Sequence, residues 1–400
     1  MKYRTRYRCF FLTLILFNLA ANFAHPVTPT LIKELNLHDY MFGAALAAML
    51  FSNFLLSPFW GKINTYISSK VSMLICSCGY GIAQVFFALS VTEPQILAAR
   101  MLAGIFTGGV YTSFLTYVVN TASNKDRGRY LTISAAIQSV ASAFGYMIGG
   151  FLGEISVMLA FMSQAAILCG CGIVFFLLCV PDNGMDLRSI SLSSFAKEAN
   201  PMNAILDGRK FMTAAFAMLF IVNVLTNIGF TSFDQAFNYY LKDVLGLTSS
   251  YNGMIKAVVG LISFVSNMTL CIWILKRKQV KKIMVLVILV CAAGALGTIV
   301  SVKIPLMIGF SILLYAAYFV SIPLIQDLVA NQAEQEQQNL VMGFYNATKN
   351  IGGMAGSLTA GFIYSVHAKL PFISTLAMFG AAAVVMGIYA GWKGKSSRAD

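Results

Sequence analysis

Long apolar segments recur along the whole chain and are separated by short polar breaks. Each segment reaches the length of ~20 predominantly apolar residues that an α-helix needs to cross a bilayer. We predict twelve membrane spans, which begin near Cys9, Met41, Val71, Pro94, Tyr130, Val157, Phe211, Tyr251, Ile283, Pro305, Leu340 and Pro371. The pattern indicates an all-α integral membrane protein.

Composition and charge support the same fold class. Hydrophobic residues make up 58% of the 400 and charged residues 11%, whereas soluble domains carry about 25% charged residues. Most of the 28 Lys and Arg residues fall in alternate loops and at the termini, which by the positive-inside rule places both termini in the cytoplasm. Because the basic residues are dispersed, the net charge of +13 reflects topology, and we expect no nucleic acid partner.

Several kinds of chemistry are disfavoured by motifs that the chain lacks. It contains no Gly-x-x-x-x-Gly-Lys-[Ser/Thr] phosphate-binding loop, no nucleophile elbow and no His-Glu-x-x-His. Seven of the eight cysteines lie inside or at the ends of apolar spans, which favours packing over disulfide or metal sites. We therefore expect a protein that is not an enzyme and that holds no cofactor and no metal.

An internal repeat divides the chain into two similar halves. The first predicted span contains Asn18-x-x-x-Asn22, and the seventh contains Asn223-x-x-x-Asn227. We expect an N-terminal six-helix half at 1–180, a cytoplasmic linker at 181–210 and a C-terminal six-helix half at 211–400 that ends in a short cytoplasmic tail. Parallel halves of this kind are the plan of one large transporter class, in which the solute site lies at the midplane between them.

Glycines repeat in the same order. The pattern at Gly145, Gly149 and Gly150 in the fifth predicted span returns at 356–361 in the eleventh. Small residues allow membrane helices to approach closely, so these glycines and Gly104 are candidates for packing at interfaces that move.

Polar side chains inside the predicted spans are candidates for the solute cavity, because an unpartnered polar group is costly in a membrane. In the first span Asn18, Asn22 and His25 share one helical face, and in the seventh span Asn223 and Asn227 do so. Either these side chains line a substrate cavity, or the amides bridge neighbouring helices.

Asp234 is a candidate proton carrier, because it and Glu154 are the only acidic residues that we place within spans. A carboxylate in a partly dry cavity can bind and release a proton near neutral pH, which would couple transport to a proton gradient. Alternatively, Asp234 forms a static ion pair with Lys256, which should lie at a comparable depth in the next span. A pair that breaks on substrate binding would satisfy both interpretations.

Arg100 lies in the fourth predicted span, within Arg100-x-x-x-Gly104-x-x-x-Gly108. Because its guanidinium group keeps its charge, it needs a carboxylate, a carbonyl or water. Glu154 would be its partner if the fourth and fifth spans pack along their glycines, and His25 should lie at a similar depth. Arg100 and His25 therefore join the candidates for proton coupling, and a structural pair of Arg100 with Glu154 is the alternative.

These motifs together resemble the major facilitator superfamily, and within it the bacterial twelve-helix drug:proton antiporters of the NorA type. Residues 96–104 look like the fourth-helix motif of that family, residues 145–150 like its fifth-helix antiporter motif, and Asp234 with its flanking phenylalanines like its acidic seventh-helix site. The resemblance covers nearly the whole chain and implies a proton-coupled transporter.

The chain departs from that family pattern in several places, among them two of its motifs and the tenth span, where Phe319 stands in place of a second acid. Tyr146 stands where the antiporter motif carries a proline, which weakens the inference of export. The cytoplasmic loop motif keeps Gly61 and Lys70, whereas Thr65, Ser68 and Ser69 stand at charged and glycine positions of the motif. We expect the latch of the inward gate to be built differently.

We therefore predict a secondary transporter of the cell membrane that exports a small hydrophobic or cationic molecule in exchange for protons. The alternatives are proton-coupled uptake of a specific nutrient, and a ligand sensor with a transporter fold that does not transport. The expected partners are the small-molecule substrate, protons and membrane lipid, and we expect a monomer.

Overall fold

The computed structural model describes residues 3–64, 66–182, 200, 202, 206, 209, 211–277, 279–333 and 338–392. All regular secondary structure in these ranges is helical. Eleven helical runs in them are long and apolar enough to cross a membrane, and α15 (Gln338–Tyr364) is a further long helix. The predicted all-α membrane fold is thereby confirmed.

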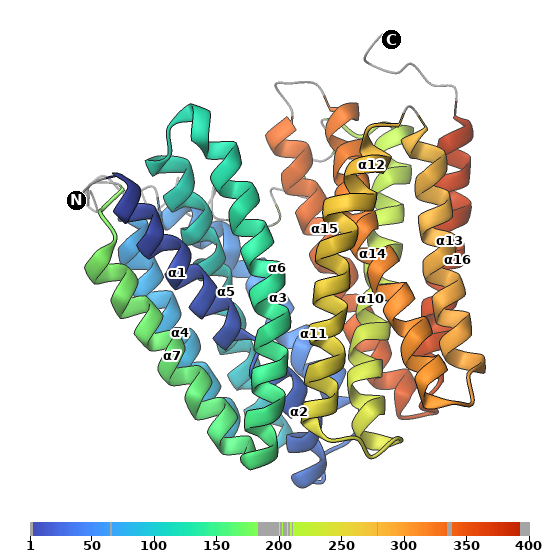
Figure 1. The fold of residues 1–400 in the computed structure, drawn as a ribbon, viewed down its shortest axis with the longest axis horizontal. Coiled ribbons are helices and arrows are strands. Elements are labelled where there is room, and N and C mark those ends of the chain that lie inside the picture. The colour runs from blue at the N-terminus through green and yellow to red at the C-terminus, as the bar shows by residue number, and fades with distance from the viewer. Residues whose placement is uncertain are drawn as a thin grey trace. The chain divides into compact units, whose positions relative to one another are not determined.

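The first of two compact units, unit 1, comprises Met1–Leu37, Ala48–Pro201 and Leu241–Gly260. Within it α4 packs against α5 and α7, and α1 packs against α6 and α7 (Figure 1). Its helices are α1 (Tyr3–Ala21), α2 (Ala24–Glu34), most of α3 (Met41–Ile63), α4 (Ser69–Leu89), α5 (Glu93–Thr121), α6 (Asn124–Ile155), α7 (Val157–Leu178) and the beginning of α11 (Ser249–Ser266).

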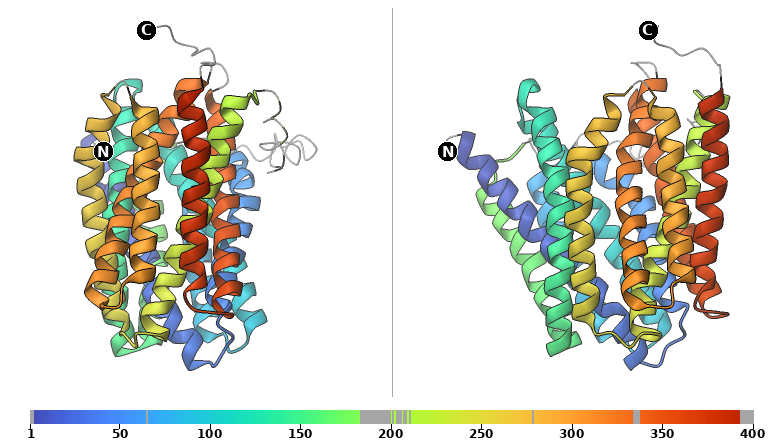
Figure 2. Two further views of the ribbon diagram at one scale, coloured as in Figure 1. Left: turned by 90° about the vertical axis from the view of Figure 1, so that its right-hand side faces the viewer. Right: turned by 45° about the vertical axis from the view of Figure 1, so that its right-hand side comes forward.

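The second unit, unit 2, comprises His38–Ala47, Met202–Tyr240 and Leu261–Asp400. In it α13 packs against both α14 and α16 (Figure 2). Unit 2 contains α15, the first part of α3 and the last part of α11. Its other helices are most of α10 (Ala214–Asp243), a π-helical turn η3 (Asn267–Cys271), α12 (Ile272–Leu275), α13 (Val280–Val300), α14 (Ile304–Gln332) and α16 (Leu370–Gly391). The linker predicted at 181–210 lies mostly outside the described residues, and the division into two halves stays a prediction.

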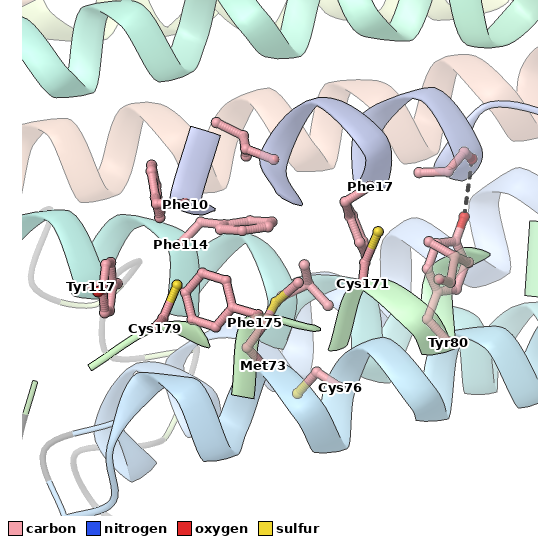
Figure 3. Close-up of a cluster of buried hydrophobic side chains, with 14 of the residues drawn as sticks. Phe10, Phe17, Met73, Cys76, Tyr80, Phe114, Tyr117, Cys171, Phe175 and Cys179 are labelled. Carbon is pink, nitrogen blue, oxygen red and sulfur yellow. Dashed lines mark hydrogen bonds between the residues drawn. The ribbon is translucent and has the colours of Figure 1, made fainter. Parts of the chain in front are cut away.

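The first predicted span is one helical run with a break. α1 ends at Ala21 and α2 begins at Ala24, two residues before Pro26, which cannot donate a backbone hydrogen bond. The Ala21 carbonyl accepts a hydrogen bond from the Tyr80 hydroxyl at 3.3 Å (Figure 3). It accepts a second one from Gln164 Nε2 at 3.0 Å. Neighbouring helices thus satisfy a backbone group at the break, as a membrane interior without water requires.

Aromatic side chains fill the core of unit 1 (Figure 3). Phe10 of α1 stacks on Tyr117 of α5 with 5.4 Å between ring centroids, and it contacts Phe175 of α7 edge to face at 6.2 Å. Cys76 and Cys179 belong to the same buried cluster, and all eight cysteines are free thiols. The prediction that buried cysteines serve packing is confirmed for this cluster.

The glycine repeat corresponds to matching backbone contacts in the two units. A Cβ atom on Gly145 of α6 would collide with the carbonyl oxygen of Leu19 in α1. In unit 2, a Cβ atom on Gly356 of α15 would collide with the carbonyl oxygen of Ile228 in α10. Because only glycine allows this approach, the fifth span packs on the first as the eleventh packs on the seventh.

Candidate functional site

Asn18 of α1 and Asn22, in the break that follows α1, lie one helical turn apart in unit 1. Asn18 is buried, donates a hydrogen bond to the Leu14 carbonyl at 2.8 Å, and accepts one from the Tyr111 hydroxyl of α5 at 3.2 Å. Asn22 donates to the Asn18 carbonyl at 2.8 Å. The side-chain nitrogens of Asn18 and Asn22 thus donate to carbonyls of the first span, whereas the side-chain oxygen of Asn18 accepts a hydrogen bond from α5.

The corresponding asparagines of α10 in unit 2 are bound to other helices. Asn223 Nδ2 donates at 3.0 Å to both the Tyr345 carbonyl and the Thr348 hydroxyl of α15. Asn227 Oδ1 accepts a hydrogen bond from the Tyr318 hydroxyl of α14 at 2.8 Å. These two amides therefore connect α10 to α14 and α15.

Asp234 of α10 is half-buried among aromatic rings in unit 2. Its Oδ1 accepts a hydrogen bond from the buried Tyr315 hydroxyl at 2.8 Å, and its Oδ2 accepts one from Gln235 Nε2 at 3.3 Å. Phe233 and Phe237 on the same helix stack with 5.6 Å between centroids, and both contact the Tyr315 ring. A neutral hydroxyl thus positions this carboxylate in largely apolar surroundings.

Arg100 of α5 is buried in unit 1, with 4% of its surface exposed. Its Nη2 donates to Thr28 Oγ1 at 3.1 Å, its Nη1 lies 4.0 Å from the Met49 sulfur, and its guanidinium carbon lies 3.9 Å from the Phe87 ring centroid. The Nε atom is buried and has no hydrogen-bond partner. Aromatic and neutral polar groups therefore surround this cation.

The pair of Arg100 with Glu154 that the sequence suggested is not formed. Glu154 accepts a hydrogen bond from the Ser250 hydroxyl of α11 at 2.5 Å, and Arg100 has no ion pair within the described ranges. The reason is the rotation of the helices: Gly104 of α5 packs against α3, whereas Gly145 of α6 packs against α1. The glycine faces of α5 and α6 consequently do not meet.

His25, Tyr146 and Lys256 converge in unit 1. The His25 ring of α2 stacks on the Tyr146 ring of α6 with 5.3 Å between centroids and an angle of 14° between planes. Lys256 Nζ of α11 lies 5.7 Å from the same Tyr146 ring, within the range of a cation–π contact. One aromatic ring thus joins two basic side chains that come from different helices.

Close helix contacts hold this arrangement together. A Cβ atom on Gly149 would collide with the backbone of Phe23, and one on Gly150 would collide with the Ser249 carbonyl of α11. Gly253 of α11 meets the Tyr146 carbonyl in the same manner. The glycines of α6 and α11 therefore set the depth at which Tyr146 and its neighbours lie.

The predicted pair of Asp234 with Lys256 joins residues of different units, and it stays a prediction. The same holds for the cavity that the asparagine faces were expected to line.

Lys70 and Gly61, the two residues that the chain shares with the family's loop motif, both lie in unit 1. Lys70 Nζ donates to the Phe176 carbonyl at 3.3 Å and lies 4.7 Å from the Phe176 ring centroid. A Cβ atom on Gly61 would meet Thr112 at 3.8 Å, an ordinary contact distance. Lys70 thus connects α4 to α7, whereas Gly61 is not required by close packing at this place.

Asp182 forms a clamp that the sequence reading missed. It accepts hydrogen bonds from Ser68 Oγ at 2.7 Å, from the Ser69 amide at 2.8 Å, from Ser69 Oγ at 2.6 Å and from Asn120 Nδ2 at 3.1 Å. Burial raises the pKa of this carboxyl, but hydrogen bonds from Ser69, Ser68 and Asn120 outweigh burial and hold the pKa below its ordinary value of 3.8. The serines that depart from the family motif therefore bind a carboxylate at the N-terminus of α4, where the helix dipole also favours it.

Comparison with known families gives a match over most of the chain. The model of the Major Facilitator Superfamily matches residues 10–357. The quinolone resistance protein NorA of Staphylococcus aureus is 23% identical over 389 residues, which cover 94% of each chain. Multidrug resistance protein 1 of Bacillus subtilis is 22% identical over 379 residues, which cover 90% of this chain and 91% of the relative.

Solved structures show the same fold with diverse solutes. A human organic anion transporter superposes with a TM-score of 0.69 at 17% identity and covers 96% of this chain and all of its own. A D-xylose-proton symporter superposes with a TM-score of 0.73 at 16% identity, covering 97% of this chain and 98% of its own. At these identities the likeness establishes the fold, and the residues above must indicate the solute.

Proposed function

Since the chain belongs to the Major Facilitator Superfamily and is a multi-pass membrane transporter, not an enzyme, we propose that it exports a small hydrophobic or cationic molecule in exchange for protons. Alternating access would move the two predicted halves, 1–180 and 211–400, about a solute site between them. Both termini would lie in the cytoplasm, and the protein would reside in the plasma membrane of its cell.

The observation that carries this proposal is the environment of Asp234. It is a half-buried carboxylate in a membrane-spanning helix, held by the neutral Tyr315 hydroxyl at 2.8 Å. A carboxylate inside a membrane is costly while it is ionised, so this group could alternate between charge states during the transport cycle and couple transport to a proton gradient. The names of two relatives, a quinolone resistance protein and a multidrug resistance protein, agree with export.

Uptake by proton symport is the second candidate function. Tyr146 occupies the position of the proline in the antiporter motif, and a D-xylose-proton symporter shares the fold. Both functions use a protonatable carboxylate, so only the direction of transport separates them.

A vesicle experiment separates the two directions. Inverted and right-side-out membrane vesicles that contain wild-type protein or the Asp234→Asn variant would receive a proton gradient and a cationic rhodamine ester. Export predicts accumulation in inverted vesicles that falls in Asp234→Asn to the level of vesicles without the protein. Accumulation confined to right-side-out vesicles would establish uptake, and equal accumulation by both proteins would exclude Asp234 as the proton carrier.

A further inference from the structure

Four basic side chains gather at the turn between α12 and α13 in unit 2. Lys276, Arg277, Lys281 and Lys282 together form what we name the basic surface. Three of them are exposed, and Lys281 is half-buried. None of the four forms an ion pair with any residue that the structure describes. The turn therefore presents a concentrated positive charge that the described part of the protein leaves without a counter-charge.

Two of these cations are held against aromatic rings. The guanidinium carbon of Arg277 lies 4.3 Å from the ring centroid of Trp273, and Lys281 Nζ lies 4.8 Å from the ring centroid of Tyr389 in α16. Both distances are within the range of a cation–π contact. The two rings thus hold the charges beside the ends of α12 and α16, so that these side chains do not extend freely into water.

Two of the three tryptophans of the chain flank the basic surface. Trp273 is 51% exposed and Trp392, directly after α16, is 50% exposed, whereas Trp60 is buried. Because Lys281 contacts Tyr389, the end of α16 lies beside the start of α13. Exposed tryptophans are enriched where membrane helices leave the hydrocarbon layer, since the ring is apolar and the indole N–H is polar. The basic surface consequently lies at the level of the lipid headgroups.

Exposed apolar side chains continue from the basic surface along the same helices. Ile272 of α12, Leu286 of α13 and Ile388 of α16 are all exposed. They lie one helical turn from Lys276, Lys282 and Trp392, respectively, on the side of each helix that leads into the membrane. The surface is therefore amphipathic in the order that a phospholipid requires, because acyl chains can contact its apolar part while a headgroup contacts the cations.

The sign of the charge indicates which lipid fits this surface. The positive-inside rule predicts that the turn between α12 and α13 faces the cytoplasm, and anionic lipids give that leaflet a negative surface charge. We propose that the basic surface binds the phosphate of an anionic phospholipid in the inner leaflet. Arg277 donates to the phosphate oxygens, and the three lysines supply further positive charge. The inference goes beyond the proposed function, because it concerns a lipid that stays bound beside the transporter and not a solute that is moved.

Brominated lipids measure this preference, because bromine quenches indole fluorescence at short range. Purified full-length protein is placed in phosphatidylcholine nanodiscs in which a rising fraction of the lipid is brominated phosphatidylglycerol or brominated phosphatidylcholine. Trp273 and Trp392 report on the lipids beside the basic surface, and the buried Trp60 contributes a constant background. Wild-type protein should bind phosphatidylglycerol at least about fivefold more tightly than phosphatidylcholine, the size of one basic contact at an anionic surface. Equal constants would overturn the proposal.

Matched variants assign the preference to this surface. Lys276→Gln combined with Arg277→Gln should lower the ratio of the two constants below about two, whereas Arg277→Lys alone keeps the charge and should keep the preference. Lys303→Gln combined with Lys369→Gln removes an equal charge from the opposite end of unit 2, where these residues precede α14 and α16, and should behave as wild type. A preference that survives the first pair of substitutions, or that the control pair abolishes, would contradict the proposal.

A soluble anion is the other occupant that the charge would accept. Glycerol 3-phosphate and sodium chloride at equal ionic strength should change the quenching by brominated phosphatidylglycerol equally, since both only screen charge. If glycerol 3-phosphate alone relieves the quenching, the surface binds a soluble phosphate and the lipid proposal is overturned. The readout needs no transport, so equal lipid constants beside export of the rhodamine ester by vesicles would refute this inference and leave the proposed function standing.

Discussion

Arg100 of α5 in unit 1 and Asp234 of α10 in unit 2 carry opposite charges in similar surroundings. Arg100 of α5 donates a hydrogen bond to Thr28 of α2 and contacts the Phe87 ring. In the seventh span, Asp234 is held by the Tyr315 hydroxyl. A charge of either sign thus contacts neutral aromatic and hydroxyl groups, so similar surroundings can hold a cation in one unit and a carboxylate in the other.

The asparagine pairs show the same divergence in packing. Asn22 bonds within its own helix, whereas Asn223 bonds to two groups of α15 and Asn227 to Tyr318 of α14. α10 is one continuous helix, but the first span breaks between α1 and α2. Neighbouring helices therefore bond to different groups of the two spans: in the first span they reach Asn18 and the Ala21 carbonyl, and in the seventh span they reach Asn223 and Asn227.

The largest expected effect on stability concerns the glycine contacts that the two units share. Gly145→Ala and Gly356→Ala should each destabilise the protein by about 1–3 kcal/mol, because the new methyl group collides with a backbone carbonyl. Gly170→Ala and Gly380→Ala are matched controls, since their Cβ atoms would meet nothing within 4 Å. Thermal unfolding in detergent measures all four. If only one of the two variants lost stability, the glycine repeat would not correspond to the same kind of helix contact in both units.

A smaller effect should separate the asparagines. Asn223→Ala removes two hydrogen bonds to α15 in a fully buried place, whereas Asn22→Ala removes one bond from the break after α1 to the Asn18 carbonyl. We expect Asn223→Ala to lower stability by about 1 kcal/mol more than Asn22→Ala, the size of a buried hydrogen bond in a membrane. Unfolding of the purified variants in one detergent gives the difference, and equal losses would remove the contrast between the two helices.

The smallest effect concerns Asp182, whose clamp belongs to unit 1. Its folded-state pKa lies below the ordinary value of 3.8, so the clamp stabilises the fold fully above that value and loses its contribution as the pH falls through the folded-state pKa. Asp182→Asn should therefore lower the melting temperature at neutral pH by an amount that disappears in acid. Melting curves of both proteins across that range test it, and a pH-independent difference would mean that the lost shape, not the lost charge, matters.

Hydrophobic periodicity predicted much of the fold, because a membrane admits few ways to satisfy the backbone. The predicted span starts at Met41 and Val157 coincide with the first residues of α3 and α7. The glycine repeat predicted close packing at Gly145 and Gly149, but it did not predict which helices they contact. The break between α1 and α2 was not predicted, although Pro26 and Pro29 follow it closely in the sequence.

The contacts of the site were harder to predict, because they depend on how each helix is rotated. Arg100 and Glu154 were expected to meet, but the glycines beside them face different helices. Tyr315 reaches Asp234 across 81 residues of sequence, a distance over which periodicity carries no information. Asp182 could have been found from the sequence, because it is the first acidic residue after the sixth predicted span and could accept hydrogen bonds from Ser68 and Ser69 at the start of α4.

The central claim is that the proton is carried in unit 2, by Asp234, and not in unit 1, by His25. The most direct measurement is the release of protons when a cationic rhodamine ester binds to purified protein in weakly buffered detergent solution, followed with a pH-sensitive dye. Wild-type protein and His25→Gln should release protons, and Asp234→Asn should release none while it still binds the ester. Release that persists in Asp234→Asn, or that disappears in His25→Gln, would contradict the assignment.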